Sequence, residues 1–116
     1  MMQDWQQLIA NMNGGVKTLR QAAPDVMKGF STMAQAALAE SALDKKTKEL
    51  IALAIGVAVR CEPCIAYHAE AAAKLGATRE EIAETMGMAV YMGAGPSVMY
   101  AAKALEAFDQ LKPPVA

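Results

Sequence analysis

The stretch KELIALAIGVAVRCEPCIAYH, residues 48–68, combines a long apolar run with two cysteines and a histidine. Cys61 and Cys64 lie three residues apart and His68 follows four residues later, and the 116-residue chain contains no other cysteine or histidine. Pro63 suits the first turn of a helix, whereas the residue before a proline disfavours helical geometry. The stretch therefore predicts two helices joined by a short turn that carries the cysteine pair.

The helix before this turn is expected to run from Asp44 to about Arg60. Its segment Leu50–Val59 is apolar on all sides, as in a helix that lies in a core or at an interface. Taken without its neighbours, this segment could also be a buried strand. The charged lead-in DKKTKE and the total length favour a helix, and Asp44 is a good N-cap residue.

Capping and breaking signals divide the rest of the chain into further helical stretches. They run from Asp4 with an interruption at NGG (13–15), from Pro24 to about Glu40, from Pro63 to Gly76, from Thr78 to about Gly93, and from Pro96 to about Leu111. Good helix formers dominate the composition and no strand-like alternation is sustained. We therefore expect an all-α helical bundle of about six helices. Since no flexible linker interrupts it, residues 1–116 are expected to form a single domain.

Charge and hydropathy exclude several classes of protein. The net charge is −1 and the basic residues are scattered, so we expect no nucleic-acid partner. The apolar run is about half the length that a membrane-spanning helix requires. The N-terminus lacks a basic segment followed by an apolar one, so we expect no signal peptide and a cytoplasmic protein. In that compartment a close cysteine pair is more often catalytic or metal-binding than a structural disulfide.

The cysteine pair and the histidine have the spacing that thiol chemistry requires. Cys61 would precede a helix and Cys64 would lie in its first turn, where the helix dipole lowers a thiol pKa. The two sulfurs can meet as a disulfide. His68 would lie one turn beyond Cys64 on the same face, within reach of its proton directly or through a water. The helix start favours Cys61 as the thiol that attacks disulfides, while the His68 spacing favours Cys64 as the one that is deprotonated.

Other interpretations of the same residues remain open. Zinc could bind Cys61, Cys64 and His68, with Glu49 or a water completing the set, and a structural disulfide would need an oxidising compartment. Arg60 could favour the Cys61 thiolate, although an arginine at a helix end is common, and Tyr67 could bond near the site, although packing is its usual role.

Glu49 gives a weaker signal when it is taken alone. A glutamate early in a helix simply favours the helix dipole. Counted from a turn at Cys61, Glu49 lies about 8 Å farther along its helix than His68 does, at ~1.5 Å per residue. This offset is long for direct contact unless the helices cross at an angle or a water bridges the pair.

Residues 48–97, from KELIALAIG to MGAGPS, resemble the alkylhydroperoxidase D-like branch of the carboxymuconolactone decarboxylase family. The pattern of that family is a glutamate, a CxxC twelve residues later, and a histidine four residues after the second cysteine. Glu49, Cys61, Cys64 and His68 match it, and the resemblance covers about 44–110, nearly the whole family core.

The resemblance implies an all-α, thiol-dependent hydroperoxide reductase or disulfide reductase. Cys64 would be the peroxidatic cysteine, Cys61 the resolving one, and His68 the proton acceptor tuned by Glu49. No cofactor or metal would be needed beyond a redox-active Cys61–Cys64 disulfide. The implied partners are a hydroperoxide, a lipoyl or thioredoxin-like dithiol that restores the thiols, and further copies in a homotrimer or homohexamer.

One departure from the family concerns the residues between the cysteines. Glu62 and Pro63 stand where the best characterised peroxidase of the family has a second histidine, so part of a proton relay is missing and slow peroxide turnover is expected. Two alternatives are a decarboxylase that uses His68 as acid and base, and a non-catalytic zinc-binding assembly module.

Overall fold

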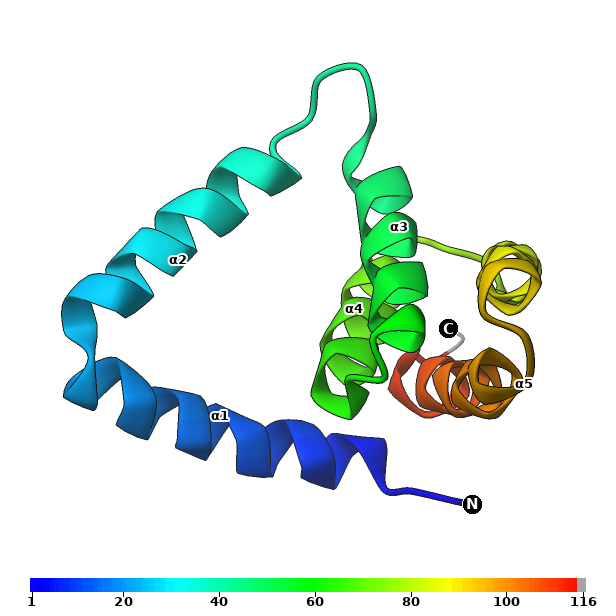
Figure 1. Ribbon diagram of the computed structural model, residues 1–116, viewed down its shortest axis with the longest axis horizontal. Helices are drawn as coiled ribbons and strands as arrows, with labels where there is room; N and C mark the ends of the chain where they lie inside the picture. Colours follow the sequence, from blue (N-terminus) through cyan, green and yellow to red (C-terminus); the bar gives the residue numbers. More distant parts are fainter. Residues whose placement is uncertain (115–116) are drawn as a thin grey trace.

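The computed structural model describes residues 1–114, and every regular element in that range is a helix (Figure 1). The helices are α1 (Trp5–Ala22), α2 (Pro24–Leu38), α3 (Lys45–Ala58), α4 (Glu62–Lys74) and α5 (Arg79–Leu111). The prediction of an all-α fold is confirmed. No helix in the described residues is both long and apolar enough to cross a membrane.

Helix α1 is continuous, so the predicted interruption at 13–15 is wrong. It begins where the Asp4 carboxylate accepts a bond from the Gln7 amide (3.0 Å) and ends at Ala22, two residues before Pro24. Gly14 and Gly15 keep their backbone N–H groups, and a Cβ at either position would meet open space. Glycine lowers helix propensity by about 1 kcal/mol relative to alanine, but unlike proline it removes no hydrogen bond.

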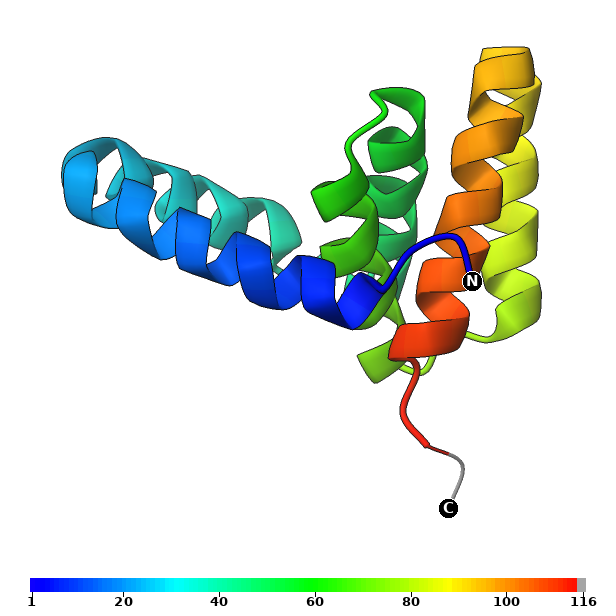
Figure 2. The same ribbon diagram turned by 90° about the horizontal axis from the view of Figure 1, so that it is seen from below.

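Helix α5 is a helical hairpin, which confirms the predicted break at 93–97. Ala94 has φ 53° and ψ −141°, and the chain reverses there. Figure 2 shows the two halves side by side. The predicted fifth and sixth helices are therefore the two halves of α5.

The core lies where α3, α4 and the α5 hairpin pack together. Leu53 and Val57 of α3, Ile65 of α4 and Ile82 of α5 are fully buried, and Trp5 at the start of α1 joins them. Gly56 brings α3 close to α4, since a Cβ there would lie 3.4 Å from the Cys64 Cβ. Helix α2 contributes no buried residue, and it projects from the body together with most of α1 (Figures 1 and 2).

The predicted caps are present. Asp44 accepts a bond from the Thr47 amide (2.8 Å), and Thr78 and Glu81 form a reciprocal capping box. Gly76 follows α4 with φ 87°, the left-handed conformation that a helix end favours. One boundary differs from the prediction by a residue, because α4 begins at Glu62 and Pro63 is its second residue.

Candidate active site

The turn between α3 and α4 places both cysteines at one helix end. The Cys61 amide donates to the Gly56 carbonyl (3.0 Å) and the Arg60 amide to the Val57 carbonyl (3.2 Å), which is a Schellman motif. Arg60 takes the left-handed position, with φ 58°, that glycine usually occupies. This tight turn makes Cys61 the N-cap residue of α4.

Cys61 and Cys64 form a disulfide, with their Cα atoms 5.2 Å apart. Both residues are half-buried, so neither is sealed inside the core. The Cys61 sulfur also lies 3.2 Å from the Cys64 amide, which donates toward it. After reduction, this free N–H and the helix dipole would favour a thiolate at the α4 N-terminus.

His68 and Glu49 are in direct contact across α3 and α4. The His68 Nδ1 lies 2.9 Å from Glu49 Oε1 and 3.4 Å from Oε2. The Glu49 side chain is only 6% exposed, while that of His68 is 33% exposed. In its ionised form the Glu49 carboxylate can only accept, so it selects the His68 tautomer that carries the proton on Nδ1 and leaves Nε2 as an acceptor. A buried carboxylate thus holds the histidine in the form of a base.

The offset between Glu49 and His68 along their helices is shorter than a count from Cys61 suggests, and the two side chains are in direct contact. The two helices meet where Gly56 faces Cys64, rather than at Cys61, because the turn uses the intervening residues. Counted from that contact, Glu49 lies seven residues back and His68 four residues on. The remaining offset of three residues is about 4.5 Å, which a glutamate side chain can span.

Cys64 and His68 line the same depression on the protein surface. Its volume is about 230 Å³, and its other walls are the apolar Ala52, Ile55 and Val59 together with Gly56. A small substrate at this position would touch the sulfur and the imidazole together, with little competing polar surface.

Tyr67 and Arg60 do not join this group. The Tyr67 hydroxyl donates a hydrogen bond to Asn13 Oδ1 and so ties α4 to α1. Arg60 lies on the rim of a different depression, between α3 and α5. Tyr67 therefore hydrogen-bonds toward α1 and not toward Cys64 or His68.

Sequence reasoning missed Lys103, whose ammonium group donates to Glu62 Oε1. The ion pair joins the α5 hairpin to the residue between the two cysteines, and Lys103 also lies 5.1 Å from the centre of the Tyr100 ring. The hydrogen bond to Glu62 raises the pKa of Lys103 above its ordinary range. No local signal could have revealed this pair, because its members are 41 residues apart.

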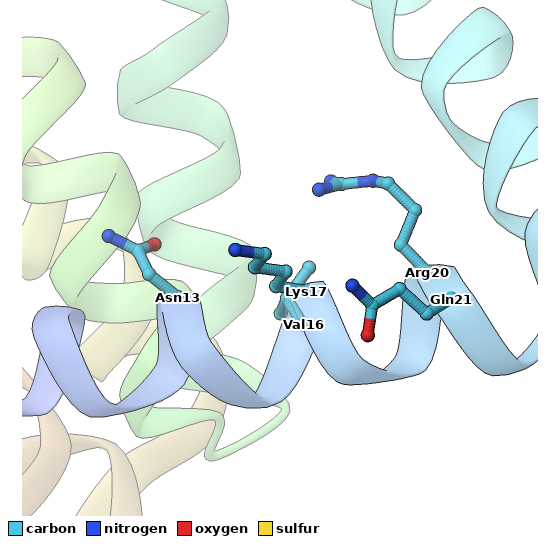
Figure 3. Close-up of a pocket in the computed structure, with 5 residues that line it drawn as sticks. All are labelled: Asn13, Val16, Lys17, Arg20 and Gln21. Carbon is cyan, nitrogen blue, oxygen red and sulfur yellow. The ribbon is translucent and has the colours of Figure 1, made fainter.

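A wider depression, of about 560 Å³, lies along α1 (Figure 3). Asn13, Val16, Lys17, Arg20 and Gln21 line it, all from this one helix. None of these side chains is suited to act as a nucleophile or a general base, and the two cysteines and His68 do not line this depression.

A zinc site would require at least three ligands in one place. Among residues 1–114 no group of three histidine, cysteine, aspartate or glutamate side chains is arranged to hold a metal ion.

Comparisons with known proteins agree with this architecture. An uncharacterized protein of Cupriavidus necator is 38% identical over 96% of this chain and 98% of its own. A crystal structure of an apo carboxymuconolactone decarboxylase family protein from Legionella pneumophila is 51% identical, covers 94% of this chain and 97% of its own, and superposes with a TM-score of 0.91.

A family member from Thermotoga maritima, whose description suggests involvement in an antioxidative response, is 26% identical with a TM-score of 0.79, covering 89% of this chain and 88% of its own. The profile of the carboxymuconolactone decarboxylase family itself matches residues 24–107. The matched residues include α2, which lies N-terminal to residues 44–110. With these matches, the resemblance is confirmed: the chain belongs to the carboxymuconolactone decarboxylase family.

Proposed function

We propose that the protein is a thiol-dependent hydroperoxide reductase that cycles between a Cys61–Cys64 disulfide and a dithiol. The observation that carries this proposal is the shared depression of Cys64 and His68, with the histidine held by buried Glu49 at 2.9 Å. A nucleophile (Cys64), a base (His68) and a carboxylate that orients the base (Glu49) are thus grouped in one place. This arrangement activates thiols in other enzymes. The antioxidative role suggested for the Thermotoga maritima relative agrees with it.

The first half of the cycle is reduction of the peroxide. Nε2 of His68 accepts the Cys64 thiol proton, and the thiolate attacks the terminal peroxide oxygen. The O–O bond breaks, Cys64 becomes a sulfenic acid, and the released alkoxide takes a proton to leave as an alcohol. The sulfur loses two electrons and the peroxide gains them.

The second half returns the enzyme to its starting state. The Cys61 thiolate attacks the Cys64 sulfur, the S–O bond breaks, and the disulfide forms while the released hydroxide takes a proton to leave as water. An external dithiol of the lipoyl or thioredoxin class then reduces the disulfide by two exchange steps. Because both cysteines are half-buried at a helix end rather than enclosed, a protein-borne dithiol has access to them.

The test is a count of free thiols before and after one equivalent of an alkyl hydroperoxide. The parent protein should lose both thiols, Cys61→Ser should retain a trappable sulfenic acid, and Cys64→Ser should not react. Hydroperoxide consumption by Cys64→Ser at the parental rate would overturn the proposal. A decarboxylase that used His68 would instead keep its activity in both cysteine variants.

Glu49 acts through His68 and is therefore a positioning residue. In Glu49→Gln the amide can donate to Nδ1, which selects the wrong tautomer, and we expect thiol oxidation at neutral pH to slow about a hundredfold. The loss should shrink at alkaline pH, where the thiolate forms without a base. A deficit that is constant at every pH would indicate a purely structural role. Glu49→Asp, which retains an acceptor, should recover part of the rate.

A further inference from the structure

A second depression lies beside the thiol site, between α3 and the tip of the α5 hairpin. Its volume is about 360 Å³, and its apolar walls are Ala54, Ile55 and Ala58 of α3 with Met88, Ala89 and Met92 of α5. It shares Ile55 with the depression that holds Cys64 and His68. Its size and mostly apolar lining are those of small-molecule sites.

Ser97 supplies this depression with a hydroxyl. The residue is 3% exposed and lines the depression. Gly93 leaves the space that the hydroxyl occupies, since a Cβ at that position would overlap it. A serine hydroxyl has one O–H donor, so Ser97 can donate to an oxygen of a ligand that lies against this wall.

Arg60 supplies a charge at the rim of the same depression. Its exposed guanidinium forms no ion pair with any described carboxylate. The backbone there has φ 58°, and Ala94, next to the lining residue Gly93, has φ 53°. These are the two non-glycine residues of 1–114 with positive φ. Strained backbone of this kind gathers at ligand sites, and an arginine in a glycine position implies a use for its side chain.

We propose that this depression binds an apolar monocarboxylate. The hydrocarbon part lies on the methionine, alanine and isoleucine side chains, which adapt to irregular shapes. The carboxylate pairs with the Arg60 guanidinium, whose planar fork matches its two oxygens, and accepts a hydrogen bond from Ser97. No other charged side chain lines the depression.

Ile55 lines both depressions, so a ligand bound in this one could also reach the thiol site. A chain that crosses Ile55 would bring its far end to Cys64 and His68. The substrate class that fits both depressions is an alkyl hydroperoxide that carries a carboxylate. This second step rests on the proposed function, whereas the carboxylate site does not.

Calorimetric titration with octanoate tests the site directly. Arg60→Gln and Ser97→Ala should each weaken binding about tenfold or more, as expected for lost hydrogen bonds to a charged group. Arg20→Gln, an exposed arginine on α1, is the matched control and should bind like the parent. Octanamide, which has the same chain without the charge, should bind weakly to every variant.

Arg60→Gly separates binding from folding. Glycine relieves the left-handed backbone, so the melting temperature should rise or stay unchanged while octanoate affinity falls as in Arg60→Gln. Absence of octanoate binding to the parent, or equal binding by all variants, would overturn the site. If octanoate binds only when the protein is dilute enough to be monomeric, another copy of the chain covers the depression. That result would also overturn the proposed site.

Kinetics test the second step. A carboxylate-bearing hydroperoxide should show a KM about tenfold lower than a neutral one of equal length, and Arg60→Gln should remove that difference. Equal KM values in the parent would overturn the link to the substrate while the octanoate site stands. If the parent binds octanoate but turns over neither hydroperoxide, the proposed function fails and the carboxylate site remains.

Discussion

Glu62 is the residue whose charge most directly concerns the two thiols, because it lies between them at the first position of α4. A carboxylate beside a thiol disfavours the thiolate. The Lys103 ammonium group, which hydrogen-bonds to that carboxylate, offsets this effect. The ion pair therefore leaves no net charge at the position between the two cysteines.

Replacing Lys103 by methionine tests this account. In Lys103→Met the Glu62 carboxylate is unpaired, so the pKa of the reactive thiol should rise, because a nearby negative charge disfavours the thiolate. The pH midpoint of alkylation by iodoacetamide, a neutral reagent, should move upward accordingly. The double variant Lys103→Met/Glu62→Gln should return to the parental midpoint. An unchanged midpoint in Lys103→Met would show that the ion pair only joins α4 to α5.

The site shows how far single residues can be predicted from sequence. Cys61, Cys64 and His68 could be grouped by spacing, because all three lie within one turn and one helix. Glu49 could be placed only by resemblance, since its distance from His68 depends on where α3 and α4 meet. The contacts of Lys103 and Ser97 could not be predicted, because they depend on how the α5 hairpin folds back over distant residues.

At the scale of elements, the site depends on the close approach of α3 to α4 at Gly56. A Cβ at this position would lie 3.4 Å from the Cys64 Cβ, so an alanine fits with a slight adjustment. Gly56→Ala should match or exceed the parent in stability, because alanine favours a helix by about 1 kcal/mol. Gly56→Leu would force the helices apart. We expect it to lower the free energy of unfolding by about 1–3 kcal/mol and to break the contact between Glu49 and His68.

Urea denaturation with thiol-oxidation rates checks both variants. Gly56→Leu should lower the free energy of unfolding and slow oxidation, whereas Gly56→Ala should oxidise like the parent. Equal oxidation rates in the two variants would mean that the contact between Glu49 and His68 does not depend on this approach.

The start of α1 is held by Glu106 of α5. Its carboxylate accepts bonds from the Met2 amide (2.7 Å), the Gln3 amide (2.9 Å) and the Trp5 indole N–H (2.9 Å). The bond from the Met2 amide, followed by that from Trp5, lowers the pKa of Glu106. A lowered carboxyl pKa stabilises the fold above the unfolded value, about 4.3, and the benefit is lost as the pH falls through the folded value.

We therefore expect acid to release α1 from the body at a pH below about 4.3. Trp5 is the only tryptophan and is fully buried, so its fluorescence should shift to longer wavelength in that range. Glu106→Gln carries no titrating group at this position and should lack the transition. The same transition in Glu106→Gln would assign it to other carboxyl groups.

Among the elements, helix ends were more predictable than helix continuity. Asp44, Thr78 and Gly76 act through their own local geometry, so their roles could be predicted from sequence. The NGG at 13–15 stays helical because nothing opposes it: the glycines lose no hydrogen bond and face open space. The break in α5 was predictable because Pro96 removes a donor that a continuous helix would need.

At the scale of the whole molecule, the chain exposes more surface than a protein of its mass usually does. Its accessible surface is 7244 Å², against roughly 6,100 Å² expected for a compact monomer of this mass. The α1–α2 arm accounts for part of the excess, since α2 has no buried residue and contacts only α1 and α3. Its half-buried residues lie on one face, and they are Met27, Ser31, Ala34 and Leu38.

Helix α2 has a second apolar stripe, which faces solvent. Val26, Phe30, Met33 and Ala37 follow helical spacing and are all exposed, Phe30 by 56%. An apolar stripe left open in this way marks an interface. We propose that it packs against another copy in the homotrimer or homohexamer that the family resemblance implies.

Light scattering after size exclusion can test this assembly. The parent should elute at a multiple of the single-chain mass, and Phe30→Glu should lower that mass because a charge would be buried at the interface. Gln35→Glu adds the same charge at an exposed position outside the stripe and should leave the mass unchanged. A parent that runs as a single chain at high concentration would contradict the proposal. Because the stripe lies away from Cys64 and His68, a dissociated Phe30→Glu should still oxidise its thiols, which separates assembly from chemistry.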